Sequence, residues 1–396
     1  MEKHPKNQKM STVGFIALLG LLSSSPPLAT DLFLPALPDM PGELGEPVSV
    51  INLIITVYFF MQAVGMLTFG PISDRFGRKN PLLVALALFI GGAIVTALAP
   101  NAWVAIGARV FQGLGGGGMV SIATALVKDC FEGETRQNAL VAIQAIGAIA
   151  PMVAPILGSA ILMVMDWRGT FLAQAVFALV ALVFFPRMVE PLAPEDRAEG
   201  NPLRCFVGLV HVTKNGLFMA LLLAGAMSMV PMMAYVTSAS YTYIDFYGTT
   251  TFVYSLFFAA NAVMSIVSTA AVPFLLKVTS WKSLMTIALA GYLAMSAILL
   301  FAAPFSPFVF LGAVIIGSFS CSVVRPVSVN ALMDLHSGDT GSAAAMINCV
   351  NTLFGCFGSL LISLPWTNFV WGLGWIALGS GVIGLLIWAF VRGKVQ

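Results

Sequence analysis

Residues 81–100 read PLLVALALFIGGAIVTALAP, a stretch in which no side chain is charged. About 20 consecutive apolar residues suffice for a helix to cross the hydrocarbon core of a bilayer. The strands of a membrane β-barrel would instead alternate apolar and polar residues over about ten positions, and this stretch shows no such alternation. The stretch therefore predicts a membrane-spanning helix.

Similar apolar runs lie on both sides of this stretch and continue along the chain, separated by short polar or Gly/Pro segments. Of the 396 residues, 59% are hydrophobic and 9% are charged, whereas a soluble domain has about 25% charged residues. This composition excludes a soluble fold. We expect an all-α membrane protein with twelve transmembrane helices, at residues 12–36, 48–70, 81–99, 102–126, 138–163, 168–187, 216–240, 250–275, 283–303, 307–332, 341–363 and 367–391.

The positions of Lys and Arg predict the orientation, because these residues concentrate in cytoplasmic loops. With the N-terminus inside, nearly every basic residue between the predicted helices lies on the cytoplasmic side, and Arg168 is the exception. The loop after the first helix contains Asp39, Glu43 and Glu46 and no basic residue. We expect a multi-pass protein of the bacterial inner membrane with both termini in the cytoplasm. The first segment is not expected to be a signal peptide, since prolines at 26–27 replace a small-residue cleavage site.

No disulfide and no metal site are expected from the cysteines and histidines. The cysteines lie in predicted cytoplasmic loops or inside predicted helices, without a partner in an oxidising loop; they are Cys130, Cys205, Cys321, Cys349 and Cys356. The histidines all lie outside the predicted helices; they are His4, His211 and His336.

A polar segment divides the chain into two halves of six helices each. We expect an N-terminal bundle at 1–187, a cytoplasmic linker at 188–215 and a C-terminal bundle at 216–396. A weak repeat supports the division, because GPISDRFGRK at 70–79 and VPFLLKVTSWK at 272–282 each follow the second helix of their half. Two such halves are typical of transporters that move one half against the other around a site at the midplane of the membrane.

Residues 70–79 also carry the resemblance that identifies a family. They fit the pattern G-x-x-x-D-R-x-G-R-[KR] at Gly70, Asp74, Arg75, Gly77, Arg78 and Lys79, and this pattern resembles the loop signature of the major facilitator superfamily. Further stretches are ATDLFLPALP at 29–38, RVFQGLG at 109–115 and APMVAPILG at 150–158. Together they resemble the bicyclomycin/chloramphenicol-resistance type of drug:proton antiporter, mainly in the N-terminal half. The resemblance implies two pseudo-symmetric six-helix bundles.

The motif at 70–79 is expected to latch the two halves on the cytoplasmic side. Placed in a short loop, Asp74 lies beside helix ends, and Arg75 and Arg78 point toward helix C-termini, where cations are favoured. The alternative is a topology signal alone, which would account for the arginines but not for the spacing of the glycines and Asp74.

Two stretches of small residues and prolines predict close helix packing. The glycines at 113–118 lie inside a hydrophobic helix and lack the Lys-Ser/Thr of a phosphate-binding loop, so we expect them to let helices approach. In the fifth helix, Pro151, Pro155 and Gly158 resemble an antiporter motif of the family. Its usual form is G-P-x-x-G-G, from which Ala150, Ala154 and Pro155 depart.

Three charged residues lie inside predicted helices, where an ionised side chain costs about 2.5–3.5 kcal/mol. They are Asp31, Arg109 and Arg325. Asp31 and Arg109 lie at similar depth in the outer third of the membrane, so they are expected to be able to pair. Asp31 is the only titratable acid in the helices and hence the candidate proton carrier, with Arg109 as its partner, and the resemblance implies the same roles. A static structural ion pair is the alternative.

Arg325 has no evident acidic partner within the helices, so it either faces a substrate cavity or snorkels to the interface. A cavity position would favour neutral or anionic substrates over cations. Other candidates to line the cavity are aromatic and amide residues, namely Tyr58, Phe111, Tyr235, Tyr254, Phe258, Asn348 and Asn351.

These features predict a proton-coupled antiporter that exports drug-like small molecules or toxic metabolites by alternating access. The alternative is an importer of the same fold that takes up a small nutrient. An enzyme is not expected, since the helices contain no metal cluster and no nucleophile beside a base. The expected coupling ion is the proton, with no other cofactor. We expect a monomer whose partners are the lipid bilayer and its substrate, with no nucleic acid.

Overall fold

The computed structural model describes residues 10–197, 213, 215–335 and 340–395. Throughout these residues the regular secondary structure is helical and no strand occurs, which confirms the all-α prediction. The chain divides into two units, Met1–Arg204 and Cys205–Gln396, a division that lies within the segment expected to be the linker. The residues His4, Cys205, His211 and His336 lie outside the described residues.

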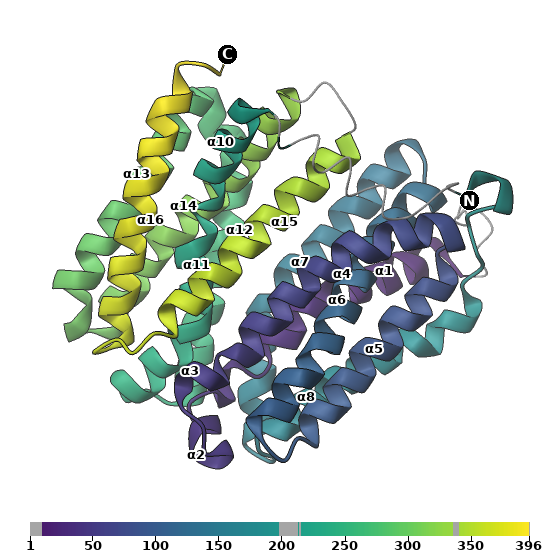
Figure 1. The fold of residues 1–396 in the computed structure, drawn as a ribbon, viewed down its shortest axis with the longest axis horizontal. Helices are drawn as coiled ribbons and strands as arrows, with labels where there is room; N and C mark the ends of the chain where they lie inside the picture. The colour runs from purple at the N-terminus through teal and green to yellow at the C-terminus, as the bar shows by residue number, and fades with distance from the viewer. Residues whose placement is uncertain (1–9, 198–212, 214, 336–339, 396) are drawn as a thin grey trace. The chain divides into compact units, whose positions relative to one another are not determined.

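The first unit contains six long helices among its described residues (Figure 1). They are α1 (Thr12–Asp31), α4 (Leu53–Phe76), α5 (Lys79–Ala97), α6 (Ala102–Cys130), α7 (Gly133–Leu162) and α8 (Trp167–Phe184). Short helical pieces flank them: η1 (Leu34–Ala36), α2 (Met40–Leu44), α3 (Val48–Ile51), η2 (Phe185–Arg187) and η3 (Pro194–Asp196).

The second unit repeats this plan in its described residues, with the first of its six spans built from three consecutive pieces. These pieces are α10 (Gly216–Ala226), α11 (Met229–Ser240) and η4 (Tyr241–Phe246), the last a π-helix. The other long helices are α12 (Thr251–Val278), α13 (Trp281–Phe301), α14 (Pro307–Asp334), α15 (Thr340–Ile362) and α16 (Phe369–Arg392), with η5 (Ala303–Phe305) between α13 and α14.

Asparagine side chains fix where several helices begin. The side chain of Asn101 accepts a hydrogen bond from the backbone N–H of Val104 at 3.0 Å, and Asn368 accepts one from Trp371 at 2.8 Å. Asn is favoured at this position because its side chain satisfies a backbone donor that has no partner within the helix. The polar residues between the apolar runs therefore mark helix starts.

The predicted spans agree closely with the observed helices. Eleven helical segments of the described chain are long and apolar enough to cross a membrane. The remaining span, expected at 341–363, corresponds to α15, whose described apolar part is the shorter segment Met346–Ile362.

The segment at 70–79 differs from the predicted loop. Helix α4 continues to Phe76, and α5 begins at Lys79, so only Gly77 and Arg78 separate the two helices. Asp74 and Arg75 therefore lie on the last turn of α4. The helix continues because this turn contains no glycine, and it ends at Gly77, whose φ of +86° favours glycine.

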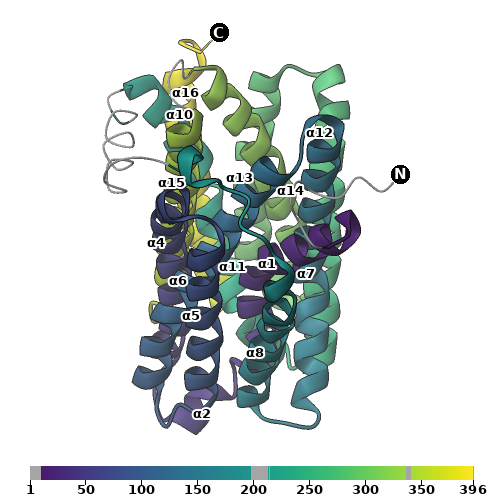
Figure 2. The same cartoon turned by 90° about the vertical axis from the view of Figure 1, so that its right-hand side faces the viewer.

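Within each unit the long helices lie side by side along a common direction (Figure 2). The same helix pairs pack together in both units. In the first unit the closest neighbours are α4 with α6, α5 with α6, α1 with α7, and α5 with α8. In the second they are α12 with α14, α13 with α14, α11 with α15, and α13 with α16. If the spans are numbered along the chain, each pair in the first unit corresponds to the pair in the second unit whose numbers are higher by six. This correspondence is a stronger sign of an internal repeat than the degenerate match between 70–79 and 272–282.

Glycines of α6 allow its neighbours to approach, as predicted from residues 113–118. A Cβ atom at Gly117 would lie 2.1 Å from the carbonyl oxygen of Gln62 on α4. One at Gly115 would lie 2.4 Å from the carbonyl oxygen of Ala85 on α5. Because backbone atoms cannot give way easily, these two positions require glycine.

Candidate functional site

Arg109 is a fully buried cation in the first unit. From α6 its Nη2 donates to the carbonyl oxygen of Ala29 at 3.0 Å, and its Nε donates to that of Ile54 at 3.1 Å. Its Nη1 donates to Oε1 of Gln112 at 2.7 Å. All three guanidinium nitrogens thus have acceptors, and the side chain connects α6 to α1 and α4.

Aromatic rings surround the same guanidinium. Its central carbon lies 4.3 Å from the ring centre of Tyr58, 5.0 Å from that of Phe33 and 5.4 Å from that of Phe171. Ring faces within about 6 Å attract a cation, most strongly where water is excluded. The rings and the carbonyl oxygens therefore stabilise a positive charge in the membrane without a carboxylate.

The expected pairing of Asp31 with Arg109 is not found as a direct ion pair. Among the described residues, Arg109 forms no salt bridge with Asp31 and contacts the backbone two residues earlier, at Ala29. The carboxylate of Asp31 accepts a hydrogen bond from the hydroxyl of Thr30 at 3.0 Å and is buried. The physical reason is that α1 ends at Asp31, so the carbonyl of Ala29 belongs to the last turn and has no acceptor role within the helix. A cation is favoured at this end of the helix.

Hydrogen bonds extend from Arg109 to α8. Nε2 of Gln112 donates to Oε1 of Gln174 at 2.9 Å, and both side chains are buried. Nε2 of Gln174 has no hydrogen-bond partner in the described structure, and the same holds for the hydroxyl of Tyr58 and for Oε1 of Gln62. Neither glutamine was predicted from the sequence. A buried amide in a transmembrane helix was the available signal, because such groups are costly in lipid.

A second cluster lies where α4 and α6 end and α5 begins. Nη1 of Arg78 contacts Oδ1 of Asp74 at 2.5 Å, and Nε contacts Oδ2 of Asp129 at 2.7 Å. The hydroxyl oxygen of Ser73 accepts from Nη1 at 2.7 Å. Burial lowers the pKa of Arg78. Asp129 and Asp74 raise it through their hydrogen bonds and negative charges, and their effect is larger, so the pKa of Arg78 lies above its usual value. This arginine joins α4 to the C-terminal end of α6.

Glu190 holds the start of α5 from the segment that was expected to be only a linker. Its Oε1 accepts from the backbone N–H of Arg78, and its Oε2 accepts from that of Lys79, both at 2.8 Å. A Cβ atom at Gly77 would lie 2.7 Å from Oε2, which is a further reason for glycine there. A carboxylate at a helix N-terminus is favoured by the exposed N–H groups. Glu190 and Asp129 were missed because their partners are distant in the sequence.

The glycine of the fifth-helix motif lies against the end of α1. A Cβ atom at Gly158 would lie 2.0 Å from the carbonyl oxygen of Leu32, the residue after Asp31. Pro151 and Pro155 are inside α7, which remains one helix from residue 133 to residue 162. The motif therefore lets α7 pack against the residues that follow the candidate proton carrier.

The candidate cavity residues occupy different environments within the two units. Tyr58 of α4 packs on Arg109. Phe111 is two residues after Arg109 on α6, but its side chain is 54% exposed. In the second unit, Tyr235 stacks on Phe258 with ring centres 5.8 Å apart, and Tyr254 lies 5.9 Å from the same ring. These three are buried. The polar candidates are more accessible, with Arg325 and Asn348 exposed and Asn351 half-buried.

Comparison with known proteins identifies the family that this arrangement represents. The model of the Major Facilitator Superfamily matches residues 19–359. The uncharacterized MFS-type transporter YdgK of Bacillus subtilis (strain 168) is 28% identical over 393 residues, which cover 98% of this chain and 96% of that protein. A bicyclomycin resistance protein homolog of Haemophilus influenzae is 30% identical over 271 residues, which cover 66% of each chain. The crystal structure of a D-xylose-proton symporter is 16% identical, covers 97% of this chain and 98% of that chain, and has a TM-score of 0.72.

These matches confirm the predicted fold and the resemblance to the bicyclomycin- and chloramphenicol-resistance group. They identify an integral membrane protein that is a transporter and not an enzyme, as predicted.

Proposed function

The chain belongs to the major facilitator superfamily, and from this premise we propose that it is a proton-coupled antiporter of the bacterial inner membrane that exports drug-like small molecules. The observation that carries this proposal is a buried acid, Asp31, two residues after Ala29, whose backbone carbonyl binds a buried arginine that no carboxylate neutralises in the described structure. The similarity to a bicyclomycin resistance protein homolog supports the choice of a drug-like substrate.

Protonation of Asp31 is the proposed coupling step. As a neutral acid, Asp31 is stable in a buried position beside the Thr30 hydroxyl. When the proton leaves, a buried carboxylate requires a cation, and Arg109 is held on the same turn of α1 through Ala29. Movement of the guanidinium from the carbonyl to the carboxylate would shift the end of α1. Because α7 packs on Leu32 through Gly158, that shift would also displace α7.

The cluster around Arg78 is the proposed conformational latch. It ties α4, α5 and α6 together at one end of the first unit. It comprises Gly70, Asp74, Arg75, Gly77, Arg78 and Lys79, with the added acids Asp129 and Glu190. In this proposal this end lies in the cytoplasm with both termini, as the distribution of Lys and Arg predicts. The cluster would act on the balance of conformations, not on substrate contacts.

The proposal is tested by flux in liposomes that contain the purified protein. A pH gradient is imposed, and movement of a radiolabelled drug such as chloramphenicol is followed together with proton movement. An antiporter moves drug and proton in opposite directions. Movement in the same direction would refute export and establish the importer alternative.

Asp31→Asn provides the residue-level test, with Asp39→Asn as the matched control outside the helices. Asp31→Asn should abolish flux driven by the gradient, while Asp39→Asn should retain it. Equal flux in the two variants would remove Asp31 from the coupling mechanism.

A further inference from the structure

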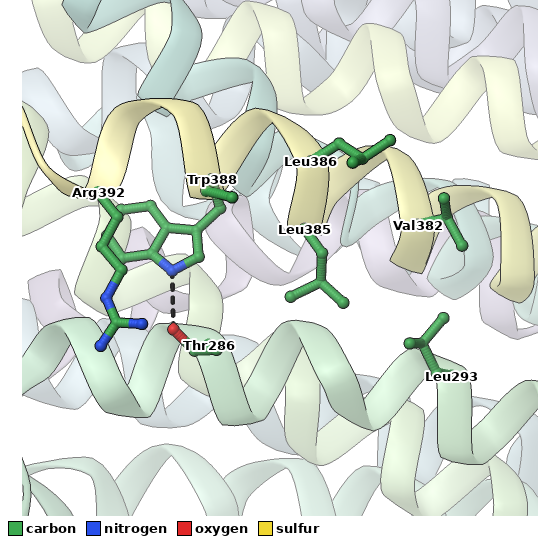
Figure 3. Close-up of a pocket in the computed structure, with 8 residues that line it drawn as sticks. Thr286, Leu293, Val382, Leu385, Leu386, Trp388 and Arg392 are labelled. Atoms are coloured by element: carbon green, nitrogen blue, oxygen red, sulfur yellow. Dashed lines mark hydrogen bonds between the residues drawn. The ribbon is translucent and has the colours of Figure 1, made fainter.

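A groove between α13 and α16 has no role in the proposed transport mechanism (Figure 3). It lies wholly within the second unit and has a volume of about 530 Å³. Leu293 on α13 and Val382, Leu385 and Leu386 on α16 form its apolar walls. In Figure 3 the two helices run side by side, with Arg392 at one end of the groove and Val382 near the other.

The end of the groove at Arg392 is polar and aromatic. Nε1 of Trp388 donates to the hydroxyl oxygen of Thr286 at 2.8 Å, which fixes the indole between the helices. The ring of Trp281 lies 5.6 Å from that of Trp388. Tryptophans of this kind are typical of the boundary between hydrocarbon and headgroups. The end of the groove therefore lies at the membrane surface.

Arg392 supplies a positive charge at that boundary. It is exposed, it lines the groove, and it takes part in no salt bridge within the described residues. No acidic residue lines the groove. An anionic group placed there meets the guanidinium of Arg392 and no acidic residue of the groove lining.

The length of the groove matches one leaflet of a bilayer. Val382 and Arg392 are ten residues apart on one helix, which corresponds to about 15 Å at about 1.5 Å per residue. The hydrocarbon core is about 30 Å thick, so one leaflet contributes about 15 Å. The groove follows the helices and therefore spans the leaflet from its charged surface to its midplane.

We propose that this groove binds a phospholipid with an anionic headgroup. The phosphate contacts Arg392 beside Trp388, and one acyl chain lies along Leu385, Leu386 and Val382. The charge at one end selects the headgroup, because basic positions at the ends of transmembrane helices attract anionic lipids. Val382 and Leu386 of the groove are exposed, so its occupant comes directly from the bilayer. This proposal is independent of the direction of transport.

The test measures lipid binding to the purified, delipidated full-length protein. Phosphatidylglycerol and phosphatidylcholine with matched chains are titrated, and retained lipid is counted by native mass spectrometry alongside the melting temperature. Wild type should retain phosphatidylglycerol in preference to phosphatidylcholine. Arg392→Gln should weaken retention of phosphatidylglycerol about fivefold, the effect of one basic residue near an anionic headgroup. Equal retention of the two lipids by wild type would overturn the proposal.

Two variants separate this groove from general attraction of lipid to a basic surface. Lys277→Gln removes an exposed positive charge from the end of α12, away from the groove, and should leave retention unchanged. Ala389→Trp fills the groove at an exposed lining position and should prevent retention although Arg392 remains. An equal loss in Lys277→Gln and Arg392→Gln, or undiminished retention in Ala389→Trp, would overturn the proposal.

Discussion

Replacement of Gly158 by alanine tests the contact between α7 and the end of α1. The added Cβ would lie 2.0 Å from the carbonyl oxygen of Leu32, about 1.4 Å short of an ordinary contact that begins at 3.4 Å. Both atoms are attached to backbone, so no side-chain rotation relieves the overlap and the helices must separate. Overpacking of this kind costs about 1–3 kcal/mol. For a unit of this size the melting temperature should fall by about 2–12 °C.

Gly147→Ala is the matched control because it lies on the same helix. A Cβ atom at Gly147 meets nothing within 4 Å, so alanine there should be neutral or slightly stabilising through its helix propensity. Both variants are purified in the same detergent, and melting is followed by tryptophan fluorescence together with gradient-driven flux. Gly158→Ala should lose both stability and flux, since the shifted turn adjoins Asp31. Identical melting temperatures in the two variants would refute the close packing of α7 on α1.

Three further changes probe the charged groups. Arg78→Ala should lower the rate of transport while substrate affinity stays nearly constant, since Arg78 contacts Asp74 and Asp129 and not the site around Arg109. A large loss of affinity measured by calorimetry would contradict the latch. Glu190→Gln should lower the stability of the first unit by about 0.3–1 kcal/mol, because a neutral amide interacts more weakly with the helix N-terminus, and thermal melts at low and high salt would check it. Arg325→Gln should reduce resistance to neutral and anionic drugs if the guanidinium faces the cavity, so a resistance profile unchanged at equal protein level would exclude that role.

The positions of the helices follow directly from the sequence. An apolar run of about 20 residues has few alternatives to a membrane-spanning helix, and loop polarity fixes its ends. The glycines of α6 were also recognised correctly, since close approach is the common use of small residues in a membrane helix.

The contacts of the site depend on information that the sequence does not display. The depth of Asp31 and Arg109 along their helices was predictable, but the rotation of each side chain about its helix axis was not. Arg109 binds a backbone carbonyl, which every residue has, so no side-chain pattern identifies Ala29 as its partner. Likewise, Asp129 is 51 residues from Arg78, and only the folded chain brings the two together.

The guanidinium of Arg109, which aromatic rings and carbonyl oxygens surround, has an electrical consequence. With Asp31 protonated, this part of the first unit carries one unbalanced positive charge in the membrane, and with Asp31 ionised the pair is neutral. In the proposed coupling cycle, the two protonation states of Asp31 therefore differ by one elementary charge, and each 100 mV of membrane potential acts on that charge with about 2.3 kcal/mol. Export of an uncharged drug against one proton would then carry current and accelerate with an inside-negative potential. Export of a monovalent cation against one proton would be electrically silent.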